Sequence, residues 1–159
     1  MGQSVCLPAN QAVLSRIKAV FSVLLSTTAL IFIGGVTVLL EVFFTKTPVS
    51  DNFIPVKTPS GLFAVSIMAA SCVIAAYLEE SFFRLLLCDR LTASGLKKSI
   101  SIFVSSLLFA VCHTWEGIWG VTGAFFSGLF LSFVFEKKKS LHHIALCHAL
   151  YNIFVYLLP

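Results

Sequence analysis

Long apolar segments constrain this chain more than any other feature of its sequence. Residues 19–44 and 62–88 each exceed the roughly 20 residues that a helix needs to cross the hydrocarbon core of a bilayer. Only 11% of the residues are charged and 58% are hydrophobic, whereas a soluble domain carries about a quarter charged residues. Such a chain cannot cover itself with polar surface, so we expect its outer solvent to be lipid.

Three further apolar segments predict helices over residues 99–114, 121–135 and 141–158. Tight turns are expected at Trp115–Gly120 and at Glu136–Ser140. The predicted fold class is therefore all-α, a polytopic membrane helix bundle of about five transmembrane helices. Its parts are a cytoplasmic N-terminal segment at 1–18, a leading transmembrane helix at 19–44, an external loop at 45–61 and a four-helix core at 62–158.

Basic residues predict how the bundle is oriented. In a five-span topology one face receives eight of them: Arg16, Lys18, Arg90, Lys97, Lys98, Lys137, Lys138 and Lys139. The opposite face receives Lys46 and Lys57. By the positive-inside rule we expect an integral protein of the cell (plasma) membrane with a cytoplasmic N-terminus. Because these charges sit in short clusters between apolar segments, they do not indicate a nucleic-acid partner; the expected surroundings are the lipid bilayer.

Ionisable side chains inside membrane helices are costly and usually functional. The first group comprises Glu79, Glu80 and Arg84 in the second helix. Glu80 and Arg84 are four residues apart, so they share a helix face and can form an ion pair. Glu79 points about 100° away from Glu80 and is left free for another task.

Two further groups contain histidine. His113 lies late in the predicted third helix, and His148 shares a face of the last helix with Asn152. Depths estimated from the helical rise overlap for all three groups. We therefore expect them to converge in one cavity that opens toward the cytoplasm. His142 and His143 follow the last basic turn and are expected to be solvated.

The ordered patterns EExxxR, FxxxH and HxxxN, each on its own membrane helix, resemble those of the CPBP (CAAX protease and bacteriocin-processing, or Abi) family. This family includes the type II CAAX prenyl endopeptidases and proteins linked to bacteriocin immunity. The resemblance covers roughly residues 62–158; the chain is shorter than fuller members and has one helix ahead of this core. The matching residues are Glu79, Glu80, Arg84, Phe109, His113, His148 and Asn152.

The resemblance implies that 62–158 is an intramembrane protease core acting on a membrane-associated protein or peptide, with a prenylated, CAAX-like one among the candidates. We interpret Glu79 as the general base and His113 as the residue that holds or helps activate the water. His148 and Asn152 would donate to the developing oxyanion, and Glu80, Arg84 and Phe109 would support the site.

Two chemistries remain open for the hydrolysis. A glutamate-activated water without a cofactor is the version we favour. A divalent metal such as zinc, with Glu79, His113 and His148 as ligands, is the alternative, although the sequence has no HExxH helix.

Two other functions fit the same residues. One is a non-enzymatic immunity or partner-binding protein on the same scaffold. The other is a small proton-coupled carrier, for which the sequence shows no inverted repeat.

Overall fold

The computed structural model describes residues 9–46 and 59–158, and every regular element within these ranges is helical. The elements are α1 (Ala9–Thr45), α2 (Leu62–Glu80), η1 (Ser81–Leu87), α3 (Cys88–Ala93), α4 (Lys98–Val111), η2 (Thr114–Glu116), α5 (Gly117–Lys138) and α6 (Leu141–Leu157). The π-helical η1 joins α2 to α3 as one continuous rod, and η2 is a single 3-10 turn. The predicted all-α bundle of five long helical segments is confirmed.

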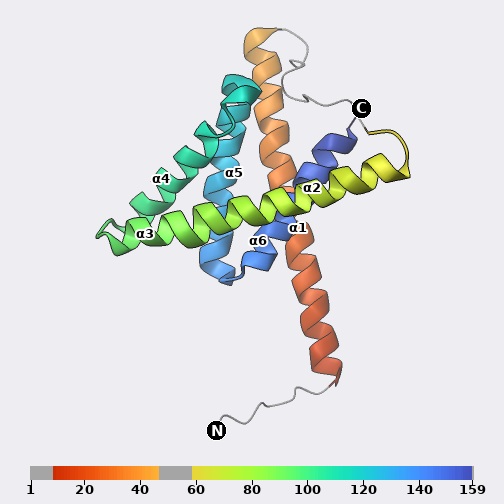
Figure 1. The fold of residues 1–159 in the computed structure, drawn as a ribbon, viewed down its shortest axis with the longest axis vertical. Helices are drawn as coiled ribbons and strands as arrows, with labels where there is room; N and C mark the ends of the chain where they lie inside the picture. The colour runs from red at the N-terminus through yellow and green to blue at the C-terminus, as the bar shows by residue number, and fades with distance from the viewer. Residues whose placement is uncertain (1–8, 47–58, 159) are drawn as a thin grey trace.

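Figure 1 shows how these segments are arranged. α1 runs the length of the molecule and packs against α5 and α6. The rod of α2, η1 and α3 crosses the other helices, with α2 packed on α6 and α3 packed on α4. α4 packs along α5. The centre of the core lies where α1, α5 and α6 meet, at Leu30, Leu131 and Ile144, each no more than 1% exposed.

The outer surface is apolar, as a lipid solvent requires. Large side chains such as Phe32, Leu78 and Phe133 point outward and are more than half exposed. Within the described residues, three stretches are long and apolar enough to cross a membrane: Val13–Thr45, Leu62–Ala93 and Thr114–Lys138. α4 and α6 are also apolar but have only 14 and 17 residues. Three of the five predicted spans therefore have the length of a full crossing.

Several helix ends differ from the predicted ones. α1 begins at Ala9, ten residues earlier than expected, because neither proline nor glycine interrupts residues 9–33. α5 covers residues 117–138, so the predicted turns at Trp115–Gly120 and Glu136–Ser140 shrink to η2 and to residues 139–140. Lys139 ends α5 in the left-handed region at φ 50°. Residues 1–8 and most of the predicted 45–61 loop lie outside the described residues.

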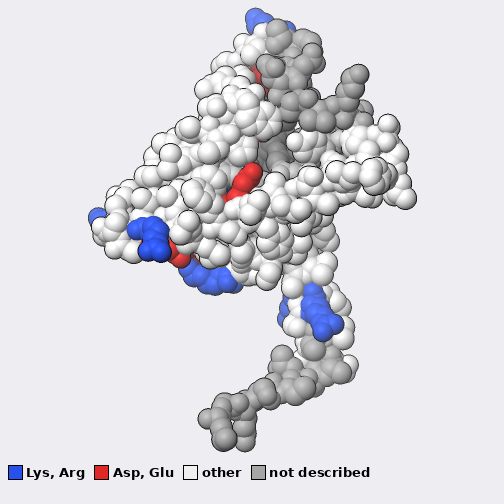
Figure 2. Space-filling view, in the orientation of Figure 1, with Lys and Arg blue, Asp and Glu red and all other residues white. Residues whose placement is uncertain are grey.

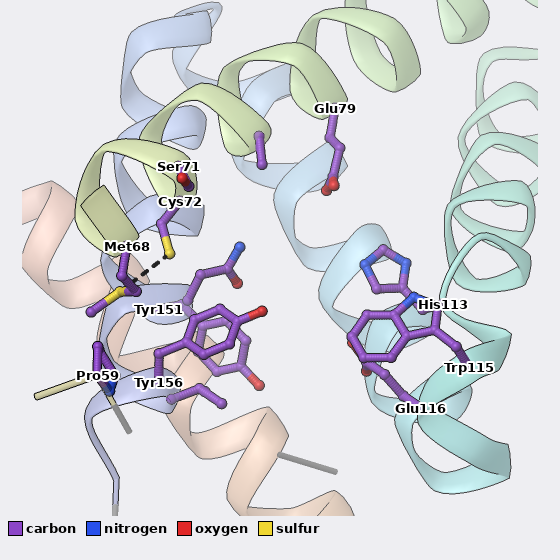
Figure 3. Close-up of a pocket in the computed structure, with 13 residues that line it drawn as sticks. Pro59, Met68, Ser71, Cys72, Glu79, His113, Trp115, Glu116, Tyr151 and Tyr156 are labelled. Carbon is purple, nitrogen blue, oxygen red and sulfur yellow. Dashed lines mark hydrogen bonds between the residues drawn. The ribbon is translucent and has the colours of Figure 1, made fainter. Parts of the chain in front are cut away.

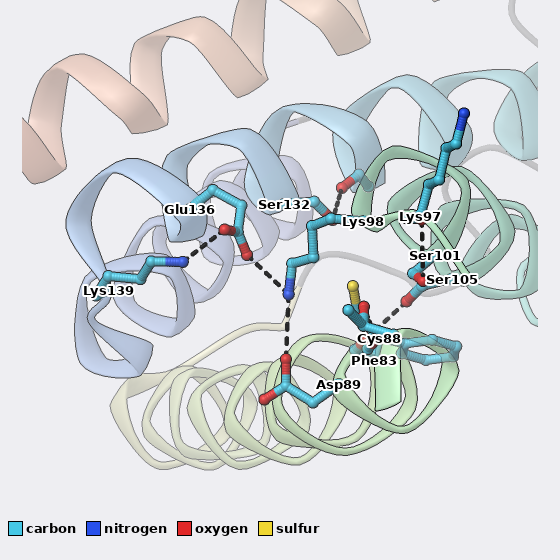
Figure 4. A network of polar contacts seen from close by, with 12 residues as sticks. Phe83, Cys88, Asp89, Lys97, Lys98, Ser101, Ser105, Ser132, Glu136 and Lys139 are labelled. Atoms are coloured by element: carbon cyan, nitrogen blue, oxygen red, sulfur yellow. Dashed lines mark hydrogen bonds and ion pairs between the residues drawn. The ribbon is translucent and has the colours of Figure 1, made fainter. Parts of the chain in front are cut away.

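Lys and Arg side chains gather along one edge of the molecule (Figure 2). At this edge Lys98 bridges two helices, because its Nζ lies 3.1 Å from Asp89 of α3 and 3.1 Å from Glu136 of α5 (Figure 4). These pairs are partly exposed, so each contributes little to stability. They connect the basic ends of α3, α4 and α5.

A buried polar contact ties α1 to α6. Nε2 of His143 lies 3.3 Å from Oγ of Ser26, and both residues are only 9% exposed. The prediction that His143 is solvated is therefore wrong, because α1 covers this face of α6. His142 is exposed as expected, and its Nδ1 lies 3.0 Å from the hydroxyl of Tyr77.

The close approach of α4 and α5 depends on Gly128. A Cβ at this position would lie 3.2 Å from Cδ1 of Phe109 and 3.3 Å from Cβ of Ser106. We expect Gly128→Val to lower the free energy of unfolding by about 1–3 kcal/mol, since overpacking forces neighbouring side chains from their rotamers. Thermal unfolding in detergent measures it, with Gly35→Val as the matched control, because a Cβ at Gly35 meets nothing within 4 Å. Equal losses in both variants would contradict this account of the α4–α5 contact.

Candidate active site

A chain of buried polar contacts links α2, η1 and α6. Oε2 of Glu80 lies 3.0 Å from Nε of Arg84, and Oε1 of Glu80 lies 2.9 Å from Nδ1 of His148. Glu80 is fully buried and Arg84 is 1% exposed. The ion pair expected from the i, i+4 spacing is confirmed. The structure adds His148 to it, which the sequence spacing did not indicate.

The Glu80 contact fixes how His148 is oriented. An ionised carboxylate can only accept a hydrogen bond, so Nδ1 of His148 is the donor in this pair. Nε2 is thereby turned toward Glu79 and lies 3.7 Å from its Oε2. The side chain of Glu79 is 34% exposed, in contrast to the buried Glu80. The two adjacent carboxylates therefore have different surroundings, as their positions on the helix predicted.

The π-helical segment η1 begins directly after Glu80 and contains Arg84. π-helical turns are rare and often occur at functional sites. Ser105 of α4 donates a 2.6 Å hydrogen bond to the carbonyl of Phe83 in this segment (Figure 4). Arg84 in turn donates through Nη2 to the carbonyl of Gly128 at 3.2 Å. These two bonds fix η1 against α4 and α5.

The ring of Phe109 packs against each of these groups. The Arg84 guanidinium lies 4.8 Å from its centroid, a cation–π distance. The rings of His113 and His148 lie 4.5 and 5.9 Å from it. Phe109 is only 2% exposed. It therefore fills the space between the ion pair and both histidines, which explains an aromatic residue at this position.

His113 lies just beyond the last residue of α4, and not within the helix as expected. Its backbone N–H bonds to the carbonyl of Ala110, which leaves the Phe109 carbonyl free. Nδ1 of the imidazole lies 2.8 Å from that carbonyl oxygen. A carbonyl can only accept, so Nδ1 carries the proton and Nε2 remains available for a water or a substrate. The helix end thus positions the imidazole and fixes its tautomer.

Glu79, His113 and Asn152 line one cavity of about 420 Å³. Figure 3 shows Glu79 approaching it from α2, His113 and Trp115 from the α4–α5 connection, and Tyr156 from α6. One residue from each of the three predicted groups therefore lies in this cavity, as expected. His148 lies behind Glu79 and is instead part of a smaller cavity of about 70 Å³, which also includes His113 and Asn152.

The larger cavity extends away from the basic edge. Pro59 before α2, Trp115 and Tyr156 line it, and all three lie near the helix ends opposite that edge. Figure 2 shows a hollow containing an acidic side chain, separate from the basic surface. The residues that line the cavity therefore do not support an opening on the side of the basic turns, and its opening toward the cytoplasm stays a prediction. Depth along each helix placed the residues together, but it did not indicate the direction in which the cavity widens.

The structure does not bring the three proposed metal ligands together as a preformed metal site. In the described part of the chain, Glu79, His113 and His148 are not arranged as a group of three side chains that could hold a metal ion. We therefore derive no step through a metal.

Two acidic residues were missed in the sequence. Glu116 lines both cavities, although its position was read as part of a turn. Glu41 in α1 is 8% exposed, and its buried Oε2 has no hydrogen-bond partner among the described residues. Glu41 could have been found as a carboxylate within an apolar segment, whereas nothing in the local pattern places Glu116 in a cavity.

The model of one protein family, described as type II CAAX prenyl endopeptidase Rce1-like, matches residues 61–154. The matched range covers more than half of the chain and contains all seven motif residues. No curated protein and no solved structure matches the chain.

Loss of Arg84 should destabilise the protein strongly. Arg84→Leu leaves the carboxylate of Glu80 buried without its cationic partner, which costs about 3–5 kcal/mol of unfolding free energy. Chemical unfolding in mild detergent measures the loss. Lys98→Leu is the matched control, because it removes two partly exposed ion pairs, each worth about 1 kcal/mol or less. If Arg84→Leu were no more destabilising than Lys98→Leu, the buried pair would not hold the site together.

Proposed function

Because this chain belongs to the type II CAAX prenyl endopeptidase Rce1-like family, we propose that it hydrolyses a CAAX-like peptide bond in the cavity around Glu79 and His113. The chain is an integral membrane protein, so the substrate is a membrane-associated peptide or protein. The observation that carries this proposal is the convergence of Glu79, His113 and Asn152 from three parts of the chain on one cavity of about 420 Å³.

In this mechanism a water lies between the carboxylate of Glu79 and Nε2 of His113. Glu79 accepts a proton from the water as the hydroxyl oxygen attacks the carbonyl carbon of the substrate. His113 orients the water by accepting its other proton in a hydrogen bond. Glu79 is suited to this role because it is half-buried and pairs with no Lys or Arg among the described residues, whereas Glu80 is held by Arg84.

Negative charge that develops on the substrate oxygen requires donors. The amide N–H of Asn152 supplies one, because Asn152 lines the same cavity as Glu79. His148 lines the smaller cavity and not this one, and its Nε2, 3.7 Å from Oε2 of Glu79, helps to position that carboxylate. When the tetrahedral species collapses, Glu79 returns the proton to the leaving amine. One water is consumed, and its hydroxyl remains on the new carboxyl group.

The walls of the cavity favour an apolar substrate. Trp115, Met68, Val155 and Tyr156 line it beside the polar groups. A cavity with aromatic and aliphatic walls and a few convergent polar groups suits a peptide with aliphatic side chains. This matches the aliphatic residues of a CAAX sequence.

We expect Glu79→Gln to lower kcat about 10²–10⁴-fold on a prenylated CAAX peptide, since the amide cannot act as a base. Its unfolding temperature should stay close to that of the wild type. Cleavage by purified protein in liposomes measures the rate, and Glu136→Gln at the basic edge is the matched control. A Glu79→Gln variant that cuts as fast as the wild type would overturn the role of Glu79. If the wild type cuts no peptide of a prenylated and unprenylated panel, the enzymatic proposal fails and a partner-binding role gains.

A strong chelator should leave the cleavage rate unchanged, because the proposed steps use only side chains of this chain. The comparison is made on protein incubated with chelator and then on the same sample after zinc is returned. Loss of activity that zinc restores would contradict the metal-free mechanism. It would then make Glu79, His113 and His148 the ligands to test individually.

A further inference from the structure

The smaller cavity, called the rear chamber below, lies on the side of the site that faces α1 and α5. Its volume is about 70 Å³, and half of the residues that line it carry polar side chains. Thr37 of α1, Ser127 of α5 and Tyr151 of α6 are among them. Buried polar surface of this kind favours water over an empty cavity, because water supplies hydrogen-bond partners.

Glycines keep the rear chamber open. A Cβ at Gly34 would lie 2.6 Å from the hydroxyl of Tyr151, and a Cβ at Gly123 would lie 3.3 Å from Oγ1 of Thr37. Both glycines line the chamber. Larger side chains at either position would therefore project into its space or displace its polar groups.

The rear chamber and the larger cavity share a wall. His113, Glu116, Tyr151 and Asn152 line both. Water that moved from the chamber into the larger cavity would pass these residues on its way to Glu79. His113 is thus in contact with the chamber on one side and with the proposed reaction centre on the other.

We propose that the rear chamber stores the water that hydrolysis consumes. This inference rests on the proposed function, in which every cleavage uses one water inside a bundle whose exterior is apolar. At the ~30 Å³ that a water occupies in the liquid, the chamber has room for about two. It holds them within reach of His113 while an apolar substrate fills the larger cavity and displaces water from there.

Radiolytic hydroxyl labelling tests whether the chamber holds water, without any need for activity. Leu131 lines the chamber and is 1% exposed, whereas Ile144 is fully buried and lines neither cavity. In wild-type protein in lipid nanodiscs, Leu131 should be labelled several-fold more than Ile144, because the radical forms from adjacent water. Gly123→Val should abolish the difference, and Gly35→Val should keep it. Equally low labelling of Leu131 and Ile144 in the wild type would overturn the proposal.

Steady-state kinetics test whether that water is the one consumed. Gly123→Val should lower kcat about tenfold, which corresponds to a barrier raised by about 1.4 kcal/mol, and should leave KM unchanged. In this variant kcat should also fall more steeply than in the wild type as an osmolyte lowers the water activity. Gly35→Val should behave as the wild type does in both respects. If the wild type cleaves the substrate and Gly123→Val has the same kcat and the same osmolyte dependence, the storage role is overturned and the proposed function is not. A wild type that cleaves no substrate overturns the proposed function, and the hydrolytic role of the chamber with it.

Discussion

The buried contact between Glu80, Arg84 and His148 is the interaction on which the rest of the site depends. A carboxylate and a guanidinium away from water are stable only when each has partners. Here the carboxylate is shared between Arg84 and His148, while Arg84 also reaches a carbonyl of α5 and the ring of Phe109. The requirement to satisfy these charges therefore sets how α2, α4, α5 and α6 pack around the cavity.

This arrangement gives two adjacent glutamates different tasks. Glu80 is fully buried and its charge is used to hold the helices and to orient His148. Glu79 faces the cavity on the neighbouring side of the same helix. Among the described residues no Lys or Arg lies within ion-pairing distance of it, and the imidazole of His148 lies 3.7 Å away. One carboxylate is therefore structural, and the other is left with the exposure and freedom that proton transfer requires.

Sequence reasoning predicted the features that depend on local periodicity. The five helical segments, the Glu80–Arg84 pair and the separation of Glu79 from Glu80 all follow from helix geometry and hydropathy. The contact between Glu80 and His148 could not be predicted, because it joins residues 68 positions apart. The position of His113 beyond the end of α4 depends on how one carbonyl is capped. The direction of the cavity depends on how the rod of α2, η1 and α3 crosses the bundle, which no single helix encodes.

The division of labour between Glu79 and Glu80 is the central claim, and two isosteric substitutions test it most directly. Glu79→Gln and Glu80→Gln would be compared for unfolding temperature and for turnover of a CAAX peptide in the same liposomes. The account predicts that Glu79→Gln stays folded and loses turnover, whereas Glu80→Gln lowers the unfolding temperature because Arg84 loses its buried counter-charge. If Glu79→Gln were the unstable variant, and Glu80→Gln were as stable as the wild type but inactive, the roles would be reversed and the account contradicted.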